Sequence, residues 1–279
     1  MPKHQAKKVN IACGNVFVTD HDWVNYDYSA SGKVVHAADL LRGLPLPDNG
    51  AELVYSSHFF EHIPRSDVSS FLAECRRVLA PGGVLRLVLP DLENICRAYL
   101  TYRDRSENEY ADFVVLEMID QCVRREPGGE LGRLYRTLKE DPTNQDDMIE
   151  FVRERTGDDL QQRPVARKFM SSTDMFYRMA RRTRGRIERI WMRAVIKMLP
   201  SAFRAQNVSL AGVGERHHWL WDFHQLSETL KDVGFVDIER CDAASSRYSD
   251  FPFQPLDLDA NGQPRKGVES MYIEAQKPV

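Results

Sequence analysis

The stretch SSHFFEHIP, residues 56–64, holds the side chains whose types and spacing first suggest chemistry. His58, Glu61 and His62 spell H-x-x-E-H, the zinc-ligand pattern of one class of metalloproteases. Such ligands must project from one face of a sustained helix, whereas Pro64 follows His62 by two residues. The sequence identifies no further acidic ligand. We therefore expect no metal here and expect Glu61 and His62 to cap a turn or hydrogen-bond neighbouring loops. A zinc protein using His58 and His62 is the alternative.

Four other residues follow short apolar runs near the start of the chain. Gly14 lets the backbone turn sharply and approach a ligand closely. Asp27, thirteen residues on, can accept hydrogen bonds from both hydroxyls of a ribose, and Asp39 beside Leu40 suits the edge and face of an adenine. The chain has neither G-x-G-x-x-G nor G-x-x-x-x-G-K-[ST], the two common phosphate cradles. These residues favour a nucleoside ligand without phosphates.

The elements that position these residues form an α/β pattern. Strands are predicted at 8–14, 23–28, 33–40 and 84–90, and at 235–242 and 269–279 near the end, while 45–57 is predicted as a Pro/Asn/Gly turn followed by the fourth strand. An amphipathic helix separates the fourth strand from the fifth, with Ser66 placed to cap it and Pro81 to stop it. Near-continuously apolar strands joined by crossovers indicate a mainly parallel sheet covered on both faces. Ligands bind at the carboxyl ends of such strands, where the residues described above stand.

Several segments of the chain, taken in order, resemble one family. VNIACGN, WVNYDYS, AADLLRGLPLPDNGAELVYSSHFFEHI, FLAECRRVLAPGGVLRLVLPDL, HHWLWDFHQLSETLKDVGFVDIERC and SMYIEAQKP resemble the class I S-adenosylmethionine-dependent methyltransferases of the type 11 kind. The resemblance covers about 8–103 and 216–277. It implies a Rossmann-like sheet of seven strands with the last one antiparallel. It also implies S-adenosylmethionine as cofactor, with S-adenosylhomocysteine as product.

Carried over position by position, the resemblance implies a set of cofactor-binding residues. Cys13, Gly14 and Asn15 would approach the methionine part, Asp27 the ribose, Asp39 and Leu40 the adenine, and Ser57 and His58 the sulfonium. The family usually has a second glycine in the first loop, and this loop has Gly14 alone. The missing second glycine bears on which backbone groups could hold the methionine carboxylate and on the shape of the loop.

The middle of the chain has a different character. Strand patterns vanish after residue 90 and helical periodicity replaces them until about 215. We predict a cofactor domain from 1–90 and 216–279, with 91–215 as a large helical insertion that caps it for substrate or oligomer contacts. A hydroxyl acceptor would need a base near its working pH. The candidate bases are His58, His217, His218 and Asp91.

The segment 174–199 is basic and amphipathic. Eight basic residues stand against one acidic residue between Arg178 and Lys197, and Ile190 and Trp191 lie on an apolar side. The segment is either a solvated helix face or an electropositive lid for an anionic acceptor such as a sugar bearing phosphate or carboxylate. Its apolar side leaves peripheral membrane binding and self-association open.

Composition limits the function classes. The chain has 279 residues, a formal charge of −3 and five cysteines without C-x-x-C spacing, so a disulfide framework and a strong nucleic-acid signal are not indicated. No apolar run reaches the length of a signal peptide or a membrane span, and we expect a cytoplasmic protein. We predict an S-adenosylmethionine-dependent methyltransferase that methylates an oxygen of a small-molecule or glycan acceptor. The alternatives are a cofactor-binding module without transferase activity and, with less support, an RNA methyltransferase.

Overall fold

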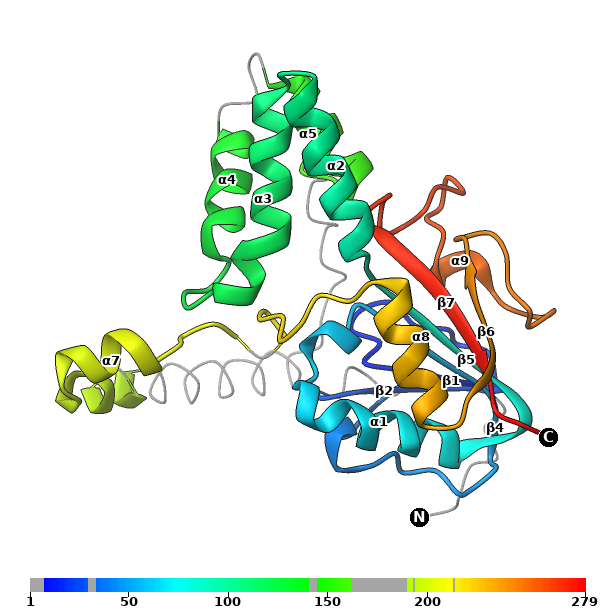
Figure 1. The fold of residues 1–279 in the computed structure, drawn as a ribbon. Coiled ribbons are helices and arrows are strands. Elements are labelled where there is room, and N and C mark those ends of the chain that lie inside the picture. Colours follow the sequence, from blue (N-terminus) through cyan, green and yellow to red (C-terminus); the bar gives the residue numbers. More distant parts are fainter. Residues whose placement is uncertain (1–7, 30–33, 141–144, 162–189, 193, 213) are drawn as a thin grey trace, which may run out of the picture.

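A seven-stranded mixed sheet forms the body of the protein in a computed structural model (Figure 1). The structure describes residues 8–29, 34–140, 145–161, 190–192, 194–212 and 214–279. The strands are β1 Lys8–Ile11, β2 Trp23–Asp27, β3 Val35–Ala37, β4 Ala51–Ser57, β5 Leu79–Pro90, β6 Val236–Cys241 and β7 Ser270–Gln276. Their order is β3-β2-β1-β4-β5-β7-β6. Strand β7 is antiparallel to both neighbours, and the other pairs are parallel, so the predicted Rossmann-like sheet is confirmed.

The predicted first helix forms, but its ends differ from the prediction. Helix α1 spans Arg65–Val78, with Pro64 at the N-cap position. Ser66 lies inside the first turn and donates a hydrogen bond to Asp67, so its prediction as the cap was wrong. The helix ends before the predicted stop at Pro81, because Leu79 is extended and pairs with Ala51 as the first residue of β5.

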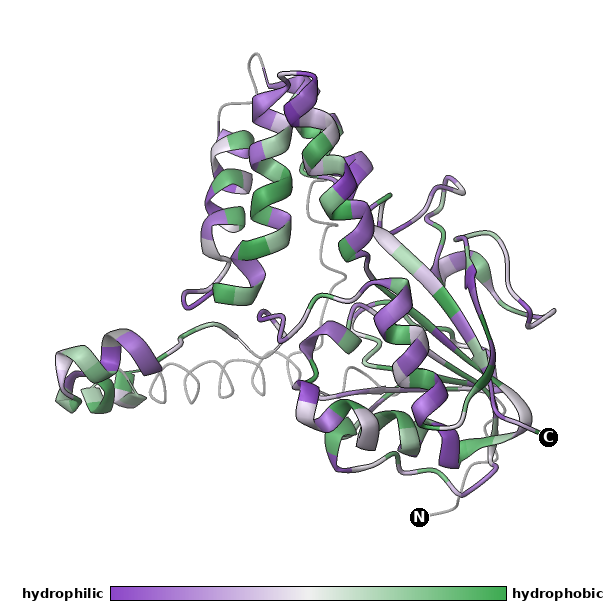
Figure 2. Ribbon diagram, in the orientation of Figure 1, coloured by the Kyte–Doolittle hydropathy of each residue, from purple (hydrophilic) through white to green (hydrophobic). Residues whose placement is uncertain are grey.

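Two hydrophobic clusters cover the two faces of the sheet. On one face α1 and α8 (Phe223–Asp232) pack Leu72, Leu226 and Leu230 into the core with no exposed surface. Burying each such side chain stabilises the fold by about 1.5–3 kcal/mol. On the other face the segment between β6 and β7, which contains α9 (Phe253–Leu256), packs on Tyr55 and Tyr272. The green apolar stripes of Figure 2 turn toward the sheet accordingly.

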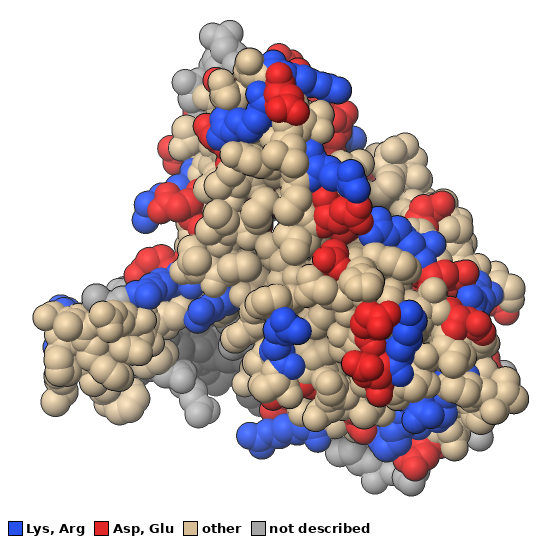
Figure 3. Space-filling model, viewed as in Figure 1, with Lys and Arg blue, Asp and Glu red and all other residues tan. Residues whose placement is uncertain are grey.

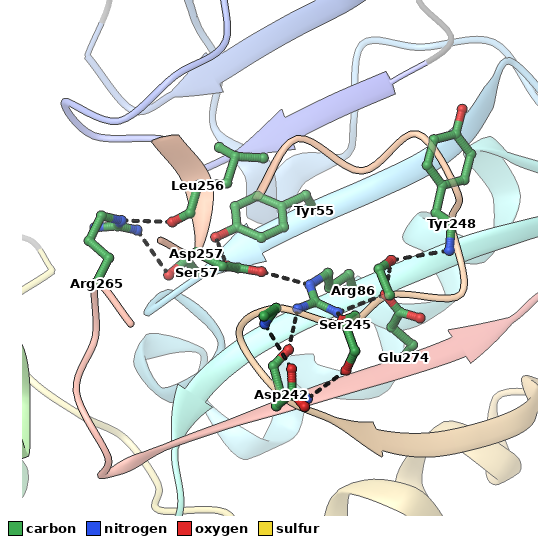
Figure 4. Close-up of polar contacts among 12 residues, drawn as sticks. Tyr55, Ser57, Arg86, Asp242, Ser245, Tyr248, Leu256, Asp257, Arg265 and Glu274 are labelled. Atoms are coloured by element: carbon green, nitrogen blue, oxygen red, sulfur yellow. Dashed lines mark hydrogen bonds and ion pairs between the residues drawn. The ribbon is translucent and has the colours of Figure 1, made fainter. Parts of the chain in front are cut away.

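A buried ion-pair network ties that β6–β7 segment to the sheet (Figure 4). The Arg86 side chain is fully buried; its Nε lies 2.8 Å from Asp257 Oδ2, and its Nη1 lies 2.8 Å from Glu274 Oε1. The guanidinium also donates to the carbonyls of Asp242 and Ser245. Tyr55 donates to the other oxygen of Asp257 at 2.7 Å. The network therefore anchors the segment between β6 and β7, residues 242–269, on the sheet.

Four helices stand beyond the carboxyl ends of β4 and β5 (Figure 1). They are α2 Leu92–Asp104, α3 Asn108–Val123, α4 Gly129–Glu140 and α5 Asp146–Thr156. A separate apolar cluster that includes Phe113 and Phe151 holds them together. Helix α4 begins at Gly129, directly after the break at Pro127-Gly128. The division into 1–90 with 216–279 and 91–215 stays a prediction.

An arm made of residues 190–192 and 194–212 extends away from the sheet and carries α7, Ser201–Asn207 (Figure 1). Most of the predicted basic segment, 174–189 and residue 193, lies outside the described residues. In the described part, Ile190, Trp191 and Met198 are 62%, 65% and 84% exposed. Figure 3 shows charges of both signs interspersed over the body and few on this arm. None of the helices that the structure describes is both long enough and apolar enough to cross a membrane.

Candidate functional site

The carboxyl ends of the first four strands meet at one edge of the sheet. Ile11 pairs with Tyr26 on one side and with Ser56 on the other. Asp27 pairs with Ala37. The loops that follow these strands therefore lie side by side, and they contain the residues predicted to bind the cofactor.

Gly14 and Asp27 are in direct contact. The Gly14 backbone, at φ +53°, donates its N–H to Asp27 Oδ2 at 2.9 Å, and Ser29 donates its N–H to Oδ1 at 3.1 Å. A Cβ added to Gly14 would meet no heavy atom of the described chain within 4 Å. The carboxylate is thus oriented by the backbone, has further lone pairs for hydroxyl donors, and lies beside open space. These features fit a ribose.

The other residues predicted around the cofactor differ in exposure. Leu40 is buried and can offer an apolar face, whereas Asp39 is exposed and lies 3.1 Å from Arg42. Cys13 is buried, and its burial, with the Asp27 charge, raises the pKa of its thiol to about 12. Asn15 is exposed. At pH 7 the Cys13 thiol is therefore neutral and acts by packing, not as a nucleophile.

A cavity of about 290 Å³ lies between the ends of β4 and β5 and the helices α3–α5. The segment after β4 contributes His58, Glu61 and His62, and the segment before α8 contributes His217. From the other sides come Glu117, Tyr135, Lys266 and Glu269. Residues far apart in sequence therefore form one polar chamber next to the predicted cofactor edge.

His58 is the candidate base at the end of β4. Its backbone is left-handed, at φ +50°, and its Nε2 lies 2.9 Å from the Ser270 hydroxyl. That hydroxyl donates to the Lys266 carbonyl, so it accepts from Nε2–H and leaves a lone pair on Nδ1. Burial, with the nearby Lys266 charge, holds the pKa of His58 well below its usual value. The imidazole is therefore neutral at pH 7.

The other candidate bases occupy different surroundings. His217 is buried in the cavity wall, and burial lowers its pKa to about 3. The His218 side chain is exposed and is not part of the wall. Asp91 caps α2 by accepting from Glu93 N–H, and it lies 3.2 Å from Arg240. The structure thus brings His58 and His217 together, while Asp91 has a structural role at the helix end.

The acidic wall of the cavity was not predicted from the sequence. Glu117 lies on α3, 2.9 Å from Arg155, and burial raises its pKa. Glu269 lies just before β7, and burial beside Glu117 raises its pKa well above the usual range. Ser57 Oγ, predicted near the sulfonium, accepts a hydrogen bond from Arg265 at 3.4 Å. No local sequence pattern distinguishes Glu117 or Glu269, because each is one of many glutamates on helices or at strand ends.

One family model matches the first part of the sheet. Residues 9–87, from β1 into β5, match the family model described as a methyltransferase domain. No curated protein matches the chain.

Solved structures of methyltransferases align weakly. An S-adenosylmethionine-dependent methyltransferase from Mesorhizobium loti is 14% identical over 99% of this chain and 93% of its own, with a TM-score of 0.38. One from Thermotoga maritima is 12% identical over 97% of this chain and 81% of its own, with a TM-score of 0.36. The complex of DhpI with SAH is 22% identical over 32% of this chain and 50% of its own, with a TM-score of 0.27.

Proposed function

We propose that this chain is a class I S-adenosylmethionine-dependent methyltransferase that methylates a hydroxyl oxygen of a small polar molecule. The observation that carries the proposal is the polar cavity beside His58, at the same edge of the sheet as Gly14 and Asp27. Its volume lies at the lower end of the ~300–1,000 Å³ range of small-molecule sites.

Residues on the strand ends would hold the cofactor. Asp27 would bind the ribose hydroxyls and Leu40 would pack on the adenine, while the Gly14 backbone leaves room for the methionine part. When bound, S-adenosylmethionine supplies the methyl group and a sulfonium leaving group. The chain's own task is then to position the acceptor oxygen and to remove its proton.

The cavity wall indicates the class of acceptor. Its described acidic side chains are Glu61, Glu117, Asp158, Glu215 and Glu269, and its described cations are Arg124 and Lys266. Arg124 is already paired with Asp120 at 2.6 Å and Glu117 with Arg155 at 2.9 Å, which leaves four acidic side chains and Lys266. Carboxyl groups accept hydrogen bonds from hydroxyls, whereas a surplus of them disfavours an anion. We therefore infer a neutral, hydroxyl-rich acceptor such as a sugar, and not the anionic one that the basic segment left open.

His58 would act as the base. Its neutral imidazole has a lone pair on Nδ1, and the hydrogen bond from Nε2 to Ser270 orients the ring. A neutral side chain also avoids placing a second positive charge beside a sulfonium. The Ser270 hydroxyl therefore positions the base without contacting the acceptor.

The test is methyl transfer from labelled S-adenosylmethionine to panels of neutral sugars, sugar phosphates, amines and RNA. We expect product with neutral hydroxyl compounds, with the label on oxygen. Glu269→Gln should raise the KM for the acceptor, whereas Glu228→Gln, an exposed change on α8, should leave it unchanged. Product only with amines or RNA would refute the acceptor class, and tight cofactor binding without any transfer would favour the binding module.

A further inference from the structure

We propose that Glu61, His62 and His217 form a binding site for one divalent transition-metal ion, of which Zn²⁺ is the best fit. One ligand atom from each of the three residues lies within 4.8 Å of the others. His62 Nε2 and His217 Nε2 are each 3.9 Å from Glu61 Oε1. Zinc bonds of ~2.0–2.2 Å place neighbouring ligand atoms about 3–4 Å apart, so small side-chain rotations complete the set.

The buried Glu61 carboxylate lacks a hydrogen-bond donor among the described residues. The residue is 1% exposed, and neither of its side-chain oxygens has a hydrogen-bond partner among the described residues. A buried carboxylate without a donor is costly, and proteins pair such groups or use them to coordinate metals. Its nearest described polar neighbours are the rings of His58, His62 and His217.

The hydrogen bonds around His62 and His58 turn lone pairs toward this carboxylate. His62 Nδ1 lies 2.8 Å from the Arg216 carbonyl, which can only accept, so Nδ1 holds the proton and Nε2 has the lone pair. This is how metal-bound histidines are usually held, with the second ring N–H donated to a carbonyl. His58 Nδ1 also has a lone pair and lies 3.4 Å from Glu61 Oε1. Lone pairs facing a carboxylate repel unless a cation or a proton lies between them.

The backbone holds the three ligands in place before any ion binds. The N–H groups of His218 and Trp219 donate to the Glu61 carbonyl at 2.7 and 3.3 Å. The His217 N–H donates to the Gln121 carbonyl of α3 at 3.1 Å. The segment before α8 is therefore fixed against the segment after β4, so binding requires little ordering of the chain.

Two imidazoles and one carboxylate that border a cavity resemble a catalytic metal set, with room for a further ligand. The inference deepens the proposed function, since a cation there would polarise the acceptor hydroxyl and His58 would accept its proton. It differs from the H-x-x-E-H interpretation of the sequence. His58 is not one of the ligands. Glu61 and His62 lie on a 3₁₀ turn (η2, Phe60–His62), and the third ligand, His217, comes from the segment before α8.

The test is metal binding by the full chain without cofactor or acceptor. After treatment with a chelator, calorimetric titration with Zn²⁺ should show one site, and Co²⁺ should give visible absorption bands. Glu61→Gln and His62→Ala should each weaken Zn²⁺ binding at least 100-fold and abolish the Co²⁺ bands. His21→Ala is the matched control, because Asp20, His21 and Asp22 form an exposed cluster of similar composition, and this variant should bind normally.

Two results would overturn the proposal: no stoichiometric binding by the wild-type chain, or equal binding by the Glu61→Gln variant. The first would mean that a proton on Glu61 bridges the histidines. Circular dichroism of each variant shows whether it has folded. Because these measurements need no methyl transfer, a failed metal site and a wrong acceptor class give different results.

Discussion

Replacing Arg86 with methionine should destabilise the protein by about 3–5 kcal/mol, the usual cost of removing one partner from a buried ion pair. Arg86 is fully buried and bonds two carboxylates, Asp257 and Glu274, that are 2% and 0% exposed. Methionine fills much of the same space but leaves both acids without their cation. For a chain of this size the loss corresponds to a fall in Tm of roughly 2–4 °C per kcal/mol.

The assay is thermal unfolding followed by circular dichroism, with Arg97→Met as the matched control. Arg97 pairs with Glu93 at 2.8 Å on α2, but the two side chains are 76% and 45% exposed. Exposed pairs of this kind contribute about 0.3–0.5 kcal/mol, so the control should unfold near the wild-type temperature. Equal Tm values for both variants would refute the reasoning that burial decides the cost.

The loss should shrink at lower pH. Burial raises the pKa of Asp257, while the Arg86 charge lowers it; removing Arg86 therefore raises this pKa further. A carboxyl group whose pKa is higher in the folded than in the unfolded state lowers the free energy of unfolding at pH values above that pKa, where it is ionised. Protonation at lower pH removes this cost. The Tm difference between variant and wild type should be smaller at pH 5 than at pH 8. A constant difference would mean that lost packing, not charge, causes the effect.

Three further predictions concern the cofactor edge and the base. Asp27→Asn should weaken S-adenosylmethionine binding by about 3 kcal/mol, or ~100-fold, because hydrogen bonds to a charged group contribute about 1.5–3 kcal/mol each; calorimetry measures it, with Asp20→Asn as an exposed control. Gly14→Ala should cost about 1–2 kcal/mol of stability through its left-handed backbone (φ +53°), measured by denaturant unfolding; no change would mean the loop relaxes. Transfer activity should stay constant from pH 9 down past the usual pKa of histidine, ~6.5, because burial lowers the pKa of His58 and its neutral form is active; a fall that already begins above pH ~6.5 would argue against His58 as the base.

The sequence by itself determined the strands of the sheet and the positions of the predicted cofactor-binding residues along them. Each strand from β1 to β5 is a local apolar run, and each predicted cofactor residue follows its own strand directly, as Gly14 follows β1 and Asp27 ends β2. Position along a strand is a local property, so the pattern predicts which end of the sheet these residues occupy.

Only the tertiary structure decided which residues line the cavity next to these strand ends. Glu61 and His217 are far apart in the chain, and they meet because the segment before α8 bonds to the backbone after β4. Glu117 and Glu269 meet because Arg155 of α5 pairs with the Glu117 carboxylate and its carbonyl accepts the Glu269 N–H. Such contacts depend on the packing of the long connections between strands, and the spacing of residues in the sequence does not predict this packing. The sequence therefore specifies the cofactor edge through local rules, while the cavity and its proposed metal site arise only when distant segments pack together.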